Sequence, residues 1–277
     1  MNKFDKPQFR IDKPERSKLL KKAWEMAGKQ IQEQFSRFNK EIINSSFDGF
    51  KWIKTELTYP SADHISFAYK SDIFSVFLDI SDDLNKSFDE RSKYRLLDFC
   101  QKNNLVPCVF KFEAREKQSN SFSKLNDLEL VPLSLGWNLY HAETNQKIEP
   151  NVDASEELTP MSAWELNNFA IQVVRSDIEK HPYKLLSLCD LLNINPQIWF
   201  EDEKGNVNWV VVKYAPEDEF DFHKWIGLER NAKQLRAYDG YFAGVDFWSH
   251  RSNSPTDLCR GDQMSAKYMG LQRVYVA

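Results

Sequence analysis

Apolar residues recur at steps of three and four along the first part of the chain. The stripe comprises Leu20, Trp24, Ala27, Ile31, Phe35, Phe38 and Ile42. This spacing predicts one face of a long amphipathic helix. The rest of its surface carries Lys18, Lys21, Lys22 and Lys29, and residues 1–41 hold 11 basic and 6 acidic side chains. Two interpretations of this basic excess remain, a solvated helix face or a surface that binds phosphate or a partner.

Three runs of strand-like composition follow the helix, at Phe50–Leu57, His64–Tyr69 and Ile73–Ile80. Short polar turns separate them. The simplest prediction for runs spaced in this way is an antiparallel meander.

A second helix is predicted at Asp89–Asn104, with Tyr94, Leu97 and Cys100 facing inward. The run Leu105–Phe112 comes directly after it and is almost entirely apolar. Such a run is typical of a strand that is buried on both faces.

Apolar periodicity stops between Thr144 and Pro160, where Asn, Asp, Glu, Ser and Pro predominate. A change of composition of this kind favours a boundary between modules. We therefore predict an N-terminal α/β module over residues 1–145, which the amphipathic helix leads, and a C-terminal α/β module over residues 160–277.

The second half broadly repeats the order of elements predicted for the first. Ser162 and Glu165 open a helix as the two ends of a capping box. The buried side of this helix is predicted to hold Leu166, Phe169, Val173 and Ile178. Then follow an apolar run at Leu185–Leu192, a hairpin of Ile198–Phe200 and Val207–Tyr214 around Lys204-Gly205, a helix at Phe222–Tyr238 and a strand at Tyr241–Trp248. The pattern predicts an α/β or α+β fold of two modules, each a mixed sheet with flanking helices.

Composition narrows the classes of function. The formal charge of −4 and the pI of about 5.8 give the whole chain no attraction to nucleic acid or anionic lipid. No apolar run is long enough to cross a bilayer, and the N-terminus lacks the apolar core of a signal peptide, so we expect a cytoplasmic protein without a membrane partner. The four cysteines have no C-x-x-C spacing and are interpreted as reduced core residues. Zinc-site, nucleotide-binding and α/β-hydrolase motifs are missing from the sequence.

One segment, NPQIWFEDEKGNVNWVVVKYA, resembles the hairpin of PD-(D/E)XK nucleases, which form the restriction-endonuclease-like superfamily. In that family an acid begins one strand, and an acid-x-Lys triad lies on the next. The two acids hold a divalent metal that activates water and stabilises the leaving oxygen, while the lysine supports the nucleophile. The resemblance extends over residues 161–248. Together with the order helix, three-strand meander, helix and strand, it implies a restriction-endonuclease-like fold.

The metal-binding positions of this motif hold neutral residues here. Gln197 stands where the family has its first acid, and Val211 stands where the triad has its acid. Lys213 keeps the charged third position of the triad. Glu165 corresponds to an acid that some members place on the first helix, although its spacing from Ser162 also suits a capping box. Lys213 and Glu165 are therefore the candidate catalytic residues.

A separate acidic group is predicted in the first half. Asp79 ends one strand, with Asp82 and Asp83 just after it, and Glu113 ends the strand that follows the next helix. If those two strands are parallel, Asp79 and Glu113 share one edge of the sheet and are candidates to hold a hard cation. The alternative is that the acids before the helix stabilise its N-terminus and have no catalytic role.

Three hypotheses for the function follow from these features. The first is a non-catalytic restriction-endonuclease-like scaffold, without a cofactor, that binds a macromolecule, either nucleic acid or protein. The second is a metal-dependent nuclease or phosphodiesterase that uses Asp79 and Glu113 with Mg²⁺. The third is an inhibitory or immunity-type module that binds a protein through exposed aromatic residues. The sequence favours the first and leaves enzymatic activity and the oligomeric state open.

Overall fold

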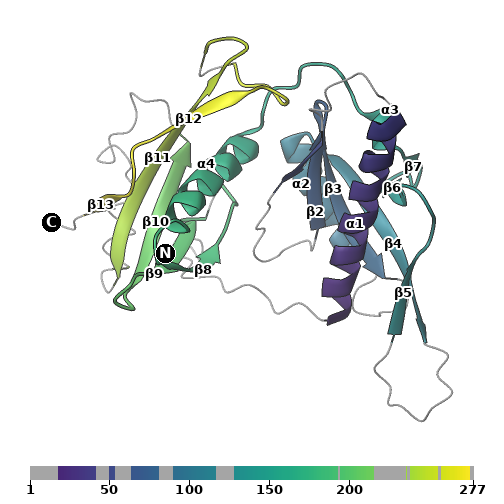
Figure 1. Ribbon diagram of the computed structural model, residues 1–277, viewed down its shortest axis with the longest axis horizontal. Coiled ribbons are helices and arrows are strands. Elements are labelled where there is room, and N and C mark those ends of the chain that lie inside the picture. Colours follow the sequence, from purple (N-terminus) through teal and green to yellow (C-terminus); the bar gives the residue numbers. More distant parts are fainter. Residues whose placement is uncertain are drawn as a thin grey trace. The chain divides into compact units, whose positions relative to one another are not determined.

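The computed structural model describes residues 18–41, 50–53, 64–80, 90–116, 128–192, 194–214, 235, 238–254 and 257–274, the side chains of 38–41, 64, 116 and 128 apart. The described residues divide into two compact units, which we call the N-terminal unit (18–158) and the C-terminal unit (159–274). Each unit has one mixed β-sheet with helices packed on it (Figure 1). The fold is therefore α+β with two modules, as the order of elements predicted.

The N-terminal unit is built on a seven-stranded sheet. Its strands are β1 (Phe50–Ile53), β2 (His64–Tyr69), β3 (Asp72–Ile80), β4 (Val106–Glu116), β5 (Leu128–Pro132), β6 (Leu139–His141) and β7 (Lys147–Ile148). The first three form the predicted antiparallel meander, in which Phe67 lies opposite both Trp52 and Phe74. β4 runs parallel to β3, and β5 and β6 pair antiparallel with β4.

Helix α1 (Lys18–Glu41) covers one face of this sheet. The predicted stripe is confirmed in the described side chains, because the fully buried residues of the helix are Leu20, Ala23, Ala27, Ile31 and Phe35. They pack against alternate residues of the strands, such as Phe67. Trp24 is half-buried, and the side chains of Phe38 and Ile42 lie outside the described part.

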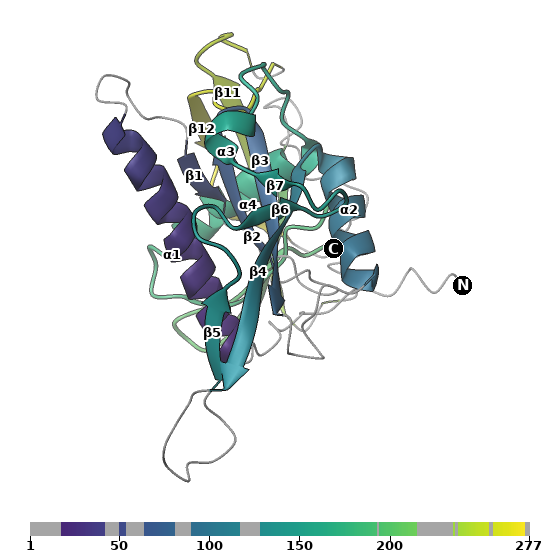
Figure 2. The same ribbon diagram turned by 90° about the vertical axis from the view of Figure 1, so that its right-hand side faces the viewer.

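Helix α2 (Glu90–Asn103) packs on the opposite face of the sheet, against β3 and β4 (Figure 2). Its buried side includes Leu96 and Cys100, whereas Tyr94 is 71% exposed. The prediction that Tyr94 faces inward is therefore wrong. Successive helix residues are about 100° apart, so a buried stripe through Leu96 and Cys100 leaves Tyr94 on the solvent side.

The polar segment between the two predicted modules carries regular structure. β7 pairs with β6, and the short helix α3 (Pro150–Asp153) follows it. The Ser155 carbonyl accepts a hydrogen bond from the Ser71 N–H (3.2 Å), and the Ser155 N–H donates to the Asp72 carboxylate (2.8 Å). These contacts join the segment to the N-terminal unit, and the division between the units comes after Leu158.

The C-terminal unit is built on a six-stranded sheet. Its strands are β8 (Lys184–Leu188), β9 (Ile198–Glu201), β10 (Val207–Tyr214), β11 (Asp239–Ser249), β12 (Met264–Tyr268) and β13 (Gln272–Val274). β8, β9 and β10 form an antiparallel meander, and the predicted hairpin is confirmed, with Gly205 (φ 80°) in its turn. β11 runs parallel to β10, and β12 and β13 both pair antiparallel with β11.

Helix α4 (Ala163–Ile178) packs on β10 and β11 (Figure 1). The predicted buried side is right for Ile178, but Leu166, Phe169 and Val173 are half-buried and lie at the edge of the core. The most deeply buried apolar residues are instead Trp164, Ala170, Ile171, Val174 and Ile178. The helix predicted at Phe222–Tyr238 falls almost entirely outside the described residues. In the part of the chain that is described, no helix is long and apolar enough to cross a membrane.

Both sheets share one topology. A helix is followed by a three-strand antiparallel meander and then by a strand that runs parallel to the third. Alternate residues of the third strand face the leading helix, Val76 and Leu78 in one unit and Val210 and Val212 in the other. The intervening residues of that strand lie on the face of the sheet away from the helix.

Replacing Ile31 in α1 with aspartate should lower the free energy of unfolding by about 3 kcal/mol or more, because a carboxylate would enter a fully buried position. Lys22→Asp is the matched control, since Lys22 is exposed on the same helix, and it should change stability by less than about 0.5 kcal/mol. Chemical denaturation followed by circular dichroism measures both variants. Equal losses would contradict the packing of α1 on the sheet.

Candidate functional site

The positions of the nuclease-like motif lie on neighbouring strands of the C-terminal sheet. Val210 is opposite Ile198 in the β9–β10 ladder, and both side chains pack in the core against α4. Since side chains alternate along a strand, Val211 and Lys213 lie on the other face. On that face Val211 belongs to a cluster with Trp199, Trp209, Leu235 and Phe242.

Gln197 joins the start of β9 to β10 through both its backbone and its side chain. Its N–H donates to the Val210 carbonyl (3.1 Å), and its Oε1 accepts from the Val212 N–H (2.9 Å). Its Nε2 donates to Asn195 Oδ1 (3.0 Å), and the residue is only 1% exposed. Both ends of the amide are therefore engaged. At this motif position the chain has a neutral group that extends the strand ladder.

Lys213 is half-buried near the end of β10, and desolvation lowers its pKa from the ordinary value of 10.5. Its partner on β11 is Gly244, and Asp246 comes two residues later on the same face of that strand. Asp246 is 6% exposed, and its Oδ1 accepts from the Phe247 N–H (2.8 Å). A basic and an acidic residue thus share this face on adjacent strands.

Glu165 has two structural partners at the start of α4. It forms the predicted capping box with Ser162, in which the Glu165 N–H donates to Ser162 Oγ (3.2 Å) and the Ser162 N–H donates to Glu165 Oε2 (2.9 Å). The Arg260 guanidinium also donates to both carboxylate oxygens, at 2.9 Å from Nε and 2.8 Å from Nη2. Both side chains of this ion pair are buried. The carboxylate is thereby committed to fixing the helix N-terminus.

Two buried carboxylates in this unit were not predicted from the sequence, those of Asp190 and Asp246. Asp190 accepts from Asn168 Nδ2 at its Oδ2 (2.8 Å), and its backbone carbonyl accepts from Asn167 Nδ2 (3.3 Å). These bonds tie α4 to the segment after β8. Each acid interrupts an apolar run, LLSLCDLL for one and YFAGVDFW for the other, and this interruption was the available signal.

In the N-terminal unit β3 and β4 are parallel, as the hypothesis of a metal site at Asp79 and Glu113 required. Asp79 is opposite Lys111, so Glu113 lies two residues further along β4 on the same face. Glu113 Oε2 accepts from Arg115 Nη2 (2.7 Å), and this hydrogen bond lowers the pKa of the Glu113 carboxyl. Two basic residues therefore share the face with the two acids.

No group of three or more His, Cys, Asp or Glu that could hold a metal ion occurs within the described ranges. Asp82 and Asp83 fall in the gap at 81–89, so their placement relative to Asp79 lies outside the described residues. The C-terminal sheet thus carries the half-buried Lys213, the buried Asp246 and a Gln197 amide that is already engaged with β10. The amino group of Lys213 and the carboxyl group of Asp246 can each hold a proton or bind a polar group.

Residues 164–274 match a protein family described as a domain of unknown function (DUF8840). The matched segment lies within the C-terminal unit and runs from the first turn of α4 to the end of β13. It therefore includes the sheet that carries Gln197, Lys213 and Asp246. Neither the curated proteins nor the solved structures gave a significant match.

Glu165→Ala should destabilise the C-terminal unit by about 3 to 5 kcal/mol, because it leaves the Arg260 guanidinium buried without its counter-charge and removes the capping box. The double variant Glu165→Met/Arg260→Met should recover most of this loss, since no charge then stays buried. Urea denaturation measures the two variants side by side. If the double variant were no more stable than Glu165→Ala, the ion pair would not be the source of the cost.

The stability of the protein should rise with pH between the depressed pKa of Lys213 and its ordinary value of 10.5. In that window the lysine is protonated in the unfolded state and neutral in the folded state, so folding releases a proton. Raising the pH favours this release and therefore raises the free energy of unfolding. Lys213→Met should flatten this part of the profile. Free energies of unfolding measured across the window test this, and identical slopes for the two proteins would show that the lysine is not desolvated.

Proposed function

We propose that the chain is a non-catalytic, restriction-endonuclease-like scaffold that binds a macromolecule. The observation that carries this proposal is the engagement of Gln197. At the position of the first metal-binding acid of the PD-(D/E)XK motif, its amide bonds the backbone of Val212 on the next strand.

The topology of the C-terminal sheet supports the resemblance. Its meander and parallel fourth strand follow the order on which the resemblance to the restriction-endonuclease-like superfamily rests. This topology puts Gln197 beside β10 and puts Val211 and Lys213 on one face of that strand.

The side chains at those positions support the absence of catalysis. Metal-assisted hydrolysis of a phosphodiester needs oxygen ligands that hold the cation, and carboxylates normally supply them. Val211 instead packs among aromatic side chains, and the Gln197 amide is already paired on both sides. Without a cation held by the motif, Lys213 has no metal-activated nucleophile to support.

Exposed aromatic side chains support the binding role. Trp52, Tyr94, Tyr238 and Trp248 are each at least 38% exposed. Tryptophan and tyrosine are enriched among the residues that dominate the energy of protein interfaces, and their faces also stack on nucleic-acid bases. Each of these rings therefore offers apolar area to a macromolecular ligand.

The test is a cleavage assay with plasmid DNA and with RNA in the presence of Mg²⁺ or Mn²⁺. We expect the purified protein to leave both substrates intact, because the motif positions provide no pair of carboxylates for the metal. The same samples, run on a native gel, report whether intact nucleic acid is retained.

Two results would contradict the non-catalytic assignment. Metal-dependent cleavage that Lys213→Ala abolishes would mean that acids from other positions complete the motif site. Cleavage that Asp79→Asn or Glu113→Gln abolishes, but that Lys213→Ala leaves unchanged, would move the active centre to the N-terminal sheet and establish the phosphodiesterase hypothesis.

A further inference from the structure

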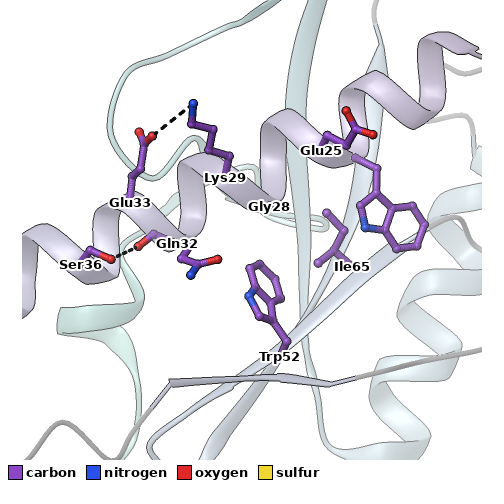
Figure 3. Close-up of a pocket in the computed structure, with 9 residues that line it drawn as sticks. Glu25, Gly28, Lys29, Gln32, Glu33, Ser36, Trp52 and Ile65 are labelled. Carbon is purple, nitrogen blue, oxygen red and sulfur yellow. Dashed lines mark hydrogen bonds and ion pairs between the residues drawn. The ribbon is translucent and has the colours of Figure 1, made fainter.

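We draw no further inference here: the strongest candidate, the groove of about 590 Å³ between α1 and strands β1 and β2 of the N-terminal sheet, which Trp24 and Trp52 line (Figure 3), carries no proposal because nothing in the structure shows what covers it.

Discussion

The parallel pairing of β10 with β11 is the constraint on which the candidate site depends. Successive side chains of a strand point to opposite faces of the sheet, and the parallel β10–β11 register puts Lys213 beside Gly244. Val210 and Val212 therefore face α4, and Val211 and Lys213 face away from it. The buried Glu165–Arg260 pair supports this arrangement by holding the N-terminus of α4 to the segment after β11.

The two sheets present the same framework with different charges. Asp79 in β3 and Lys213 in β10 both lie on the face of their sheet away from the leading helix. Asp79 is opposite Lys111, which comes two residues before Glu113. Lys213 is opposite Gly244, which comes two residues before Asp246. In the N-terminal unit the acid is half-buried and paired with Arg115, whereas in the C-terminal unit the acid is buried and the lysine on the same face is desolvated. The same topology thus supplies two polar faces that differ in burial.

Local patterns in the sequence predicted the elements well, because periodicity and turn chemistry act over a few residues. The α1 stripe, the β9–β10 hairpin and the Ser162–Glu165 capping box follow from such patterns. The inward side of α2 was misjudged at Tyr94, because aromatic character does not determine which face of a helix packs. The partners of the site residues that lie far away in the sequence could not be predicted. Glu165 meets Arg260 across 95 positions of sequence, and Gln197 bonds Val212 only once the ladder register is fixed.

Titration of the full chain with Mn²⁺ followed by electron paramagnetic resonance tests most directly our proposal that Gln197, Val211 and Lys213 of the C-terminal sheet hold no metal. Mn²⁺ reports binding whether or not catalysis follows, and it accepts the oxygen ligands that Mg²⁺ uses. We expect no saturable site that responds to substitution of Lys213 or Gln197. One tightly bound Mn²⁺ per chain, released by Asp246→Asn or perturbed by Lys213→Ala, would contradict it.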